Sequence, residues 1–160
     1  KVFVWGESKF GQLGLGKENV SYVLEPTKLP NEEKHNILDV YAGFRQTYLL
    51  CGQNKILCTG SNKFLEFGQT TKEGTMFSPV TLEFPKINGQ IKKLAIGQKH
   101  VIALNHNGEI YGWGSNKFGQ LGIENKDKET NYEYRKLEVS DVKEISCGWN
   151  HSLLLLSKNP

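Results

Sequence analysis

Two histidines of this chain stand in matching local sequence, and they are the first candidates for chemistry. His100 and His151 each follow a glycine by three residues, and imidazole is the side chain that most often moves protons near neutral pH. An active site is not copied at a fixed step along a chain, however. We therefore interpret both imidazoles as structural groups, each hydrogen-bonded within its own blade, the sheet that one repeat is expected to form. His35 and His106 lie in polar surroundings and are expected to be solvated.

Other residue types that support catalysis do not form a recognisable site. Cys51, Cys58 and Cys147 lack metal-ligand spacing, so we expect buried free thiols of an intracellular protein. No Ser-His-Asp or Cys-His arrangement can be assembled, because the residues fall in different repeats. The Gly-rich segments lack both the strand–glycine–helix fingerprint and the Gly-Lys-Ser/Thr of phosphate loops. The sequence predicts no catalytic residue, no cofactor and no metal ion.

Composition limits the class of protein. Hydrophobic residues make up 38% of the 160 residues and charged residues 23%, with a formal net charge of +3. These values are typical of a soluble globular protein. No apolar run approaches the roughly 18 residues of a membrane-spanning helix, and the lysines form no nucleic-acid-binding stripe. The chain opens on Lys1 with no apolar leader, so we expect a segment of a longer intracellular protein.

A ten-residue segment recurs along the chain, and the structure that it forms must position any functional site. Residues 5–14 return as residues 113–122, 108 positions later, with eight of the ten residues identical. Halfway between, residues 59–68 keep both outer glycines and the Lys-Phe pair but lack Gly-Gln-Leu. A second element, a short apolar run ending at Gly43, Gly97 and Gly148, keeps step with the first. We therefore divide the chain into repeats 1–54, 55–108 (degenerate) and 109–160.

Each repeat has the pattern of β-structure. Residues 2–5, 56–58 and 110–113 are short runs of strand-forming residues. Apolar runs also flank Asn107-Gly108, a hairpin signal in which both turn residues adopt positive φ. All-β units with a period near 50 residues predict propeller blades, and a solenoid is the lesser alternative.

The paired motifs resemble a known repeat. Trp-Gly-x-Asn-x-x-Gly-Gln-Leu-Gly, followed by Gly-x-x-His-Ser-x-x-Leu, is similar to the regulator of chromosome condensation repeat. The third repeat matches best, and the resemblance covers nearly the whole chain. It implies a seven-bladed β-propeller, of which this chain holds three blades. Departures at residues 65–67 and at Gln46, which replaces the histidine, affect single turns rather than the fold.

The resemblance implies several functions. The family includes an exchange factor for the small GTPase Ran, scaffolds, ciliary proteins and substrate-docking parts of ubiquitin ligases, so its fold does not specify one activity. We expect a protein-interaction or scaffolding module without chemistry of its own, binding protein partners rather than nucleic acid directly. The alternatives are a guanine-nucleotide exchange factor for a Ran-like GTPase and a substrate-docking portion of a ubiquitin ligase. The cytoplasm, the nucleus and the cilium are all open as its location.

Residues shared by the repeats are expected to be structural, with both tryptophans in the core and the rings of the Lys-Phe pairs packed inward. These shared residues are Trp5, Gly6, Gly11, Gly14, Gly43, Gly60, Gly68, Gly97, His100, Trp113, Gly114, Gly119, Gly122, Gly148 and His151.

Positions that vary within the repeated frame are better candidates for binding. Two such positions follow each of the glycines that end the apolar runs, Gly43, Gly97 and Gly148. They are occupied by Phe44-Arg45, Gln98-Lys99 and Trp149-Asn150. Because they are equivalent, we expect them on one face, in neighbouring blades. Aromatic residues and arginine anchor many interfaces, so these six residues are our partner-contact candidates. Ordinary loop residues are the alternative interpretation.

Three blades are fewer than the four to eight that close a propeller. The chain begins in the second strand of a hairpin and ends in the first strand of another. An open arc would expose strand edges and apolar blade faces. We therefore expect the rest of a longer propeller, or neighbouring chains, to cover its ends.

Overall fold

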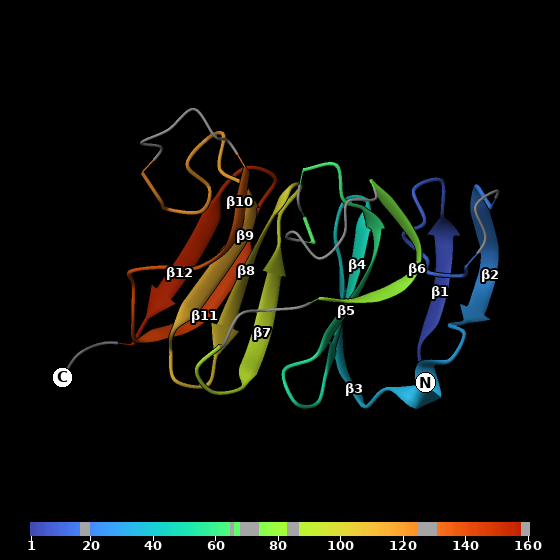
Figure 1. Cartoon of the computed structure of the whole chain (residues 1–160), viewed down its shortest axis with the longest axis horizontal. Helices are drawn as coiled ribbons and strands as arrows, with labels where there is room; N and C mark the ends of the chain where they lie inside the picture. The colour runs from blue at the N-terminus through green and yellow to red at the C-terminus, as the bar shows by residue number, and fades with distance from the viewer. Residues whose placement is uncertain (17–19, 65, 68–73, 83–86, 125–130, 158–160) are drawn as a thin grey trace. The chain divides into compact units, whose positions relative to one another are not determined.

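The computed structural model describes residues 1–16, 20–64, 66–67, 74–82, 87–124 and 131–157. Within these ranges the chain forms twelve β-strands, one short 3₁₀-helix, η1 (Glu32–Lys34), and no α-helix (Figure 1). The all-β prediction is therefore confirmed. In the same ranges, no helix has the length and apolar character needed to cross a membrane. Gly68 lies outside the described residues.

The chain divides into two compact units, and the first comprises Lys1–Lys63 and Lys72–Leu82. It holds an antiparallel pair, β1-β2, and a four-stranded antiparallel sheet in the order β3-β4-β5-β6. The strands are β1 (Phe3–Glu7), β2 (Tyr22–Lys28), β3 (Ile37–Ala42), β4 (Gln46–Cys51), β5 (Ile56–Ser61) and β6 (Thr75–Leu82).

The second unit comprises Phe64–Thr71 and Glu83–Pro160. It repeats the same parts in the opposite order, a four-stranded sheet β10-β9-β8-β7 and then an antiparallel pair β11-β12. The strands are β7 (Ile91–Ile96), β8 (His100–Asn105), β9 (Ile110–Ser115), β10 (Asn131–Lys136), β11 (Val142–Cys147) and β12 (Ser152–Leu156).

Sequence repeats and sheets are offset by two strands. The predicted repeat limits at 54/55 and 108/109 fall in the β4–β5 and β8–β9 turns, so each four-stranded sheet contains parts of two repeats. By sequence, β1-β2 corresponds to β5-β6 and β9-β10, whereas β11-β12 corresponds to β3-β4 and β7-β8.

Strand registers reproduce the sequence repeat in detail. The pairing of β1, β5 and β9 with the following strand shifts register across Trp5, Thr59 and Trp113, each of which stands immediately before a glycine at positive φ, and the extra residues lie on the partner strand. A bulge inserts an extra residue and twists the strand locally. All three copies shift register at this position, and the glycine that follows has positive φ, a backbone conformation that favours glycine.

The central strands carry the core. Every residue of β5, β8 and β9 is buried, as expected for strands covered on both faces. In the second unit, one cluster joins Ile102, Ile110, Leu121 and Ile145. In the first unit, Leu29, Leu49 and Leu57 form its counterpart. The repeat motif thus contributes a core residue, Leu121, from the loop as well as from the strands.

The predicted hairpin at Asn107-Gly108 is present, but its turn differs from the prediction. Leu104 pairs with Ile110 across β8 and β9, and Gly108 has φ of 77° while Asn107 is not at positive φ. The N–H of Gly108 donates to the Asn105 carbonyl (3.3 Å), and the Asn105 N–H donates to the Glu109 carbonyl (3.0 Å). This is a three-residue turn closed by a glycine, so only one residue needs the left-handed conformation.

The two-stranded pairs leave large apolar side chains exposed. Trp5 is 58% exposed, which corrects the predicted core position, whereas its counterpart Trp113 is 1% exposed. The physical reason is that β9 is a central strand of four, while β1 has a single partner strand. The four leucines of β12, Leu153–Leu156, are exposed for the same reason.

Candidate functional site

The three variable residue pairs form the tips of three equivalent hairpins. The β3–β4, β7–β8 and β11–β12 connections comprise residues 43–45, 97–99 and 148–151, and in each of them two residues stand between a glycine and the residue that closes the turn. The N–H of Gly43, Gly97 and Gly148 donates to the carbonyl of the third following residue, at 2.7, 2.8 and 2.9 Å respectively. Phe44-Arg45, Gln98-Lys99 and Trp149-Asn150 therefore occupy identical backbone positions. We call these the first, second and third tips.

The second and third tips adjoin within the second unit. The N–H of Gln98 donates to the carbonyl of Trp149 at 3.1 Å. The structure therefore brings together two of the three predicted candidate pairs. That all three tips share one face stays a prediction.

Glycines of the neighbouring strand hold the first and second tips in place. Gly60 and Gly114 have φ of 114° and 93°, and a Cβ atom on either would collide with the carbonyl of Arg45 or Lys99. The N–H of the residue after each glycine donates to that same carbonyl, at 2.9 and 2.7 Å. The close backbone approach at these two glycines thus anchors the tips.

The cation of each of these tips lies over a phenylalanine of the Lys-Phe pair. The Arg45 guanidinium carbon is 4.0 Å from the centroid of the Phe10 ring, and Lys99 Nζ is 3.6 Å from that of Phe64. Both distances are well within the range of cation–π attraction. Phe10 and Phe64 are partly buried, in keeping with the predicted inward packing.

A turn shared by the three copies of the motif holds the backbone of each phenylalanine. The side chain two residues later accepts the phenylalanine N–H in every copy: Gln12 at 2.9 Å, Glu66 at 2.7 Å and Gln120 at 2.9 Å. Glutamate retains this bond where the degenerate repeat has lost its Gly-Gln-Leu. The Glu66 side chain is buried, and its carboxylate oxygen is the acceptor that this N–H requires.

The third tip differs from the other two. Asn150 occupies the slot of Arg45 and Lys99, and the Phe118 ring is 64% exposed, which corrects the predicted inward packing in this copy. Lys117 Nζ lies 5.4 Å from the ring centroid. Trp149 at the same tip is 62% exposed. Phe118 and Asn150 also border a cavity of about 350 Å³ in the second unit, together with Leu121, Leu137 and Leu154.

His100 is fully buried and joins two sheets. Its Nε2 lies 3.0 Å from Ser152 Oγ, and Ser152 Oγ donates to the Gln120 carbonyl at 2.8 Å. Because Ser152 belongs to β12, the predicted hydrogen bond within one blade is wrong: the imidazole bonds to the next sheet. Burial lowers the pKa of His100 to about 4, so the ring is neutral at pH 7. Its equivalent, His151, is exposed.

Trp113, on β9, binds the backbone of the degenerate motif. The indole Nε1 donates to the Glu66 carbonyl at 2.7 Å, and the indole packs against Tyr134 with 6.0 Å between ring centroids. A buried indole N–H needs such a partner. This tryptophan is therefore a structural anchor rather than a ligand platform.

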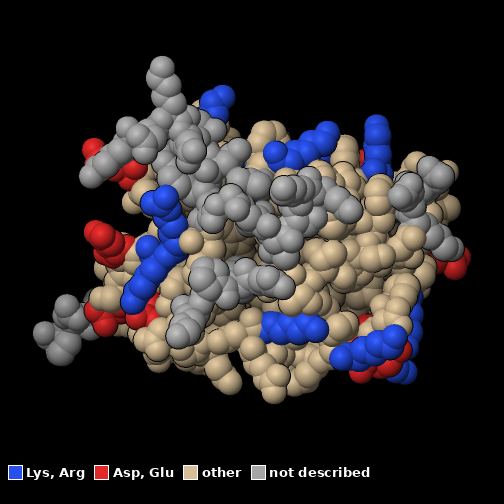
Figure 2. All heavy atoms as spheres, in the orientation of Figure 1, with Lys and Arg blue, Asp and Glu red and all other residues tan. Residues whose placement is uncertain are grey.

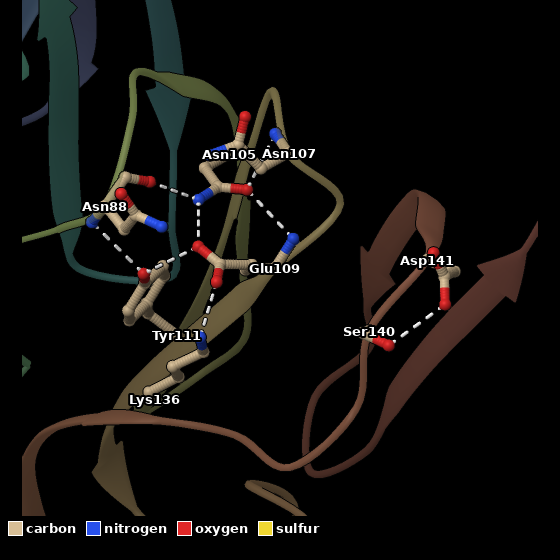
Figure 3. Close-up of polar contacts among 8 residues, drawn as sticks. All are labelled: Asn88, Asn105, Asn107, Glu109, Tyr111, Lys136, Ser140 and Asp141. Atoms are coloured by element: carbon tan, nitrogen blue, oxygen red, sulfur yellow. Dashed lines mark hydrogen bonds and ion pairs between the residues drawn. The ribbon is translucent and has the colours of Figure 1, made fainter.

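A polar network at the β8–β9 turn resembles an active site in its residue types (Figure 3). The amide of Asn105 donates to the Asn88 carbonyl (2.5 Å) and to the Glu109 carboxylate (2.7 Å). Glu109 also accepts from Tyr111 (3.1 Å) and Lys136 (2.5 Å), and the bond from Lys136 lowers its pKa to about 2. Every carboxylate oxygen is engaged with groups of the same sheet region, so the network fixes the turn.

The thiols and the acidic residues provide no reactive centre in the described part of the chain. Cys51, Cys58 and Cys147 are free, and burial raises the pKa of each, to about 11 for Cys147. Such thiols are poor nucleophiles at neutral pH. Within the described ranges, no three His, Cys, Asp or Glu residues lie close enough to hold a metal ion.

Sequence reasoning placed the tips but missed their partners. Arg45 and Lys99 each stand about 35 residues after the phenylalanine that they cover, so the two residues of each contact belong to different sequence motifs. A signal was available: a basic residue stands two positions after glycine in two repeats, and asparagine replaces it in the third. Only packing reveals that the two patterns meet.

Comparisons with known proteins agree with this geometry. Models of the regulator of chromosome condensation (RCC1) repeat match residues 1–50 and 107–155, and a second such model matches residues 91–120. The ultraviolet-B receptor UVR8 of Arabidopsis thaliana is 31% identical over 99% of this chain and 35% of its own length. The probable E3 ubiquitin-protein ligase HERC4 of Homo sapiens is 31% identical over 95% of this chain and 14% of its own. The guanine nucleotide exchange factor SRM1 of Saccharomyces cerevisiae is 27% identical over 97% of this chain and 33% of its own.

Solved structures share the fold. Yeast RCC1 (Prp20), solved bound to Kap60, matches with a TM-score of 0.76 and 22% identity over 96% of this chain and 37% of that one. Human WBSCR16 matches with a TM-score of 0.74 and 19% identity, over 96% and 44% respectively. The chain therefore spans less than half the length of each of these proteins. Because the family models match more than half of its residues, the chain belongs to the regulator of chromosome condensation (RCC1) repeat family.

Proposed function

We propose that this chain is a protein-interaction module that binds its partner through the hairpin tips. The observation that carries the proposal is that three hairpins with the same closing hydrogen bond present different residues at their tips. Two of the tips expose an aromatic side chain, Phe44 at 53% and Trp149 at 62%. Exposed aromatic residues on rigid supports are the side chains that most often dominate binding energy at protein interfaces.

The distribution of charge supports a protein partner. On the face drawn in Figure 2, the described lysines and arginines alternate with acidic and uncharged surface. Binding to a nucleic-acid backbone relies on many basic groups acting together, so a mixed surface favours a protein as the ligand.

Substitution at the tips tests the proposal. The unchanged chain is immobilised, and the proteins that it captures from a native extract are quantified by mass spectrometry. The variant with Trp149→Ala and Phe44→Ala should capture at least about tenfold less of these proteins. Trp5→Ala and Tyr22→Ala are the matched controls, because Trp5 (58%) and Tyr22 (66%) are equally exposed aromatics on β1 and β2. Equal capture by the tip variants and the controls would refute binding through the tips.

Guanine-nucleotide exchange is a second candidate, supported by the likeness to the exchange factor SRM1. It predicts that the chain accelerates release of a fluorescent guanine nucleotide from at least one small GTPase, in a panel that includes a Ran-type member. Release at the intrinsic rate for the whole panel would refute exchange activity.

A substrate-docking role in a ubiquitin ligase is the third candidate, supported by the likeness to HERC4 and HERC3. In that case the catalytic part is a different polypeptide region. The prediction is that a protein captured through the tips becomes ubiquitinated when the chain is fused to an active ligase domain, and that Trp149→Ala abolishes this modification.

A further inference from the structure

We infer that the edge of β1 opposite β2 is a docking surface for a single strand, β12 of a second copy of this chain. Such docking is independent of partner binding through the tips. Two observations support it. The strand pairs at the two ends of the chain are complementary parts of one sheet, and three glycines have open space where their counterparts contact a neighbouring strand.

The two-stranded pairs correspond to the two halves of a four-stranded sheet. In each four-stranded sheet a first pair, β3-β4 or β7-β8, adjoins a second pair, β5-β6 or β9-β10. By sequence, β11-β12 is a first pair and β1-β2 is a second pair, and within the described residues each lacks its complement. Joining β12 of one copy to β1 of another therefore gives the strand order of a complete sheet.

Gly6, on β1, has the backbone conformation of a contact that its own copy does not make. Its counterparts on β5 and β9, Gly60 and Gly114, have φ of 114° and 93°, and a Cβ atom on either would collide with a carbonyl of the adjoining tip. Gly6 has φ of 100°, but a Cβ atom there would meet no atom within 4 Å. The equivalent tip carbonyl is that of Asn150, so docked β12 would bring it into this space.

The last copy of the motif has matching open space on the other side of the proposed contact. In the first copy, a Cβ atom on Gly11 would lie 2.5 Å from the carbonyl oxygen of Met76 on β6, and one on Gly14 would contact side chains of β5 and β6. On their counterparts, Gly119 and Gly122, a Cβ atom would meet nothing within 4 Å. Because β1 and β2 correspond to β5 and β6, these strands of a second copy would fill the space.

The existing sheets define the register of the proposed pairing. Ile102 of β8 pairs with Gly112 of β9, and β4 pairs with β5 at the equivalent offset. The same offset pairs Leu153 with Val4 of a second copy. The pairing would cover the leucines of β12, which are 38% to 62% exposed, and Trp5, which is 58% exposed. Burial of this apolar surface favours association.

Two copies are the number that suits closure. One copy contains two four-stranded sheets and two half-sheets, which amount to three blades, fewer than the four to eight of a closed propeller. Two copies joined at both ends contain six blades, and the same contact then occurs twice, related by a two-fold axis. We therefore expect a dimer rather than closure of a single copy.

Disulfide trapping between two singly substituted chains tests the pairing. Chains with Val4→Cys and with Leu153→Cys are mixed and oxidised mildly, so a bond between the new cysteines must join two copies. The fold accepts cysteine at this position, because Cys58 occupies it on β5. The linked product should exceed that of a Phe3→Cys and Leu153→Cys mixture by at least about tenfold, because consecutive residues of a strand face opposite sides. Mass spectrometry of the linked peptides identifies the bonded cysteines.

A substitution at Gly119 tests the open space by a separate measurement. Gly119→Ala meets no atom within one copy, but in the dimer it would press on β2 of the second copy. The dimer dissociation constant from sedimentation equilibrium should therefore rise by at least about tenfold. Gly108→Ala, at a glycine with the same φ of 77° in the β8–β9 turn, is the matched control and should leave the constant unchanged.

Three results would overturn the inference. They are equal trapping in the two cysteine mixtures, a dissociation constant that Gly119→Ala does not change in a variant with native spectra, and a chain that stays monomeric at every concentration. Capture of partners through the tips would still stand in each case, because it is measured on immobilised chain with substitutions elsewhere.

Discussion

At the scale of single residues, the same residue type plays different roles in different repeats because its surroundings differ. Trp113 is buried with its indole N–H bonded to Glu66, and Trp5 is exposed. His100 is buried against the next sheet, and His151 is exposed. Matched residues within one chain therefore serve as internal controls for each other.

Trp113→Phe should destabilise the chain far more than Trp5→Phe. The first change removes buried ring atoms and leaves the Glu66 carbonyl without its 2.7 Å donor, at a cost of about 2–4 kcal/mol. The second changes an exposed ring and should stay within about 0.5 kcal/mol. Urea unfolding followed by circular dichroism measures both, and equal losses would contradict the anchoring role of Trp113.

His100 should make stability depend on pH in a defined window. Burial lowers its pKa from 6.5 to about 4 in the folded chain, so the unfolded chain binds the proton more readily between these values. Stability is therefore full above pH 6.5 and decreases as the pH falls towards 4, by at most about 3 kcal/mol.

The control for this prediction comes from the first repeat. Gln46 occupies the position of His100 there and is also buried, so His100→Gln should fold. Carboxylates titrate in both proteins, and only the difference between them reports His100. Unfolding midpoints that change with pH equally in the unchanged chain and in His100→Gln would disprove the assignment.

At the scale of elements, hairpins are the units that the repeat specifies. Each β3–β4-type hairpin combines a glycine, a two-residue tip and a residue that closes the turn, with the same hydrogen bond at 2.7–2.9 Å in all three copies. The glycine also makes room for the closing side chain: a Cβ atom on Gly97 or Gly148 would collide with the imidazole of His100 or His151.

Alanine at these two glycines should have unequal effects. His100 is fully buried and has no space to withdraw, so Gly97→Ala should cost about 1–3 kcal/mol through overpacking. His151 is exposed and can rotate away, so Gly148→Ala should be close to neutral. Thermal unfolding of the two variants provides the measurement. A neutral Gly97→Ala variant would show that the glycine is not required by the imidazole.

At the scale of the whole molecule, the sheets are complete at the centre of the sequence and two-stranded at either end. The β12 strand exposes Leu153 and Leu155 at 62% and 57% on a strand that has a single partner, β11. Exposed apolar strands with an open edge favour association with other strands.

The isolated chain should therefore associate as its concentration rises, and charge on β12 should oppose this. Leu153→Lys with Leu155→Lys should lower the weight-average mass measured by light scattering, because lysine on an edge strand disfavours pairing. Leu24→Lys, at an 83% exposed leucine on β2, controls for the added charge alone. A chain that stays monomeric at every concentration would contradict the prediction.

Much of the fold followed from the sequence, because local physical chemistry is repeated in it. The period, the glycine positions and the apolar runs predicted β-blades, the β8–β9 hairpin and the place of the six tip residues. The type of the β8–β9 turn was not predicted, because the Asn105 side chain and Gly108 together stabilise a three-residue turn that a two-residue pattern does not suggest.

Tertiary structure alone decided how equivalent residues differ. Whether a tryptophan or histidine is buried depends on how many strands flank it, and the sequence around Trp5 and Trp113 is nearly the same. The meeting of Arg45 with Phe10 and of Lys99 with Phe64 joins residues about 35 positions apart, through packing that no local pattern encodes. The sequence by itself determined the repeated frame, because backbone geometry and periodic burial are local properties. The exposure of Phe118 and Trp149 depends on which strands and loops pack beside them, so only the tertiary structure reveals it.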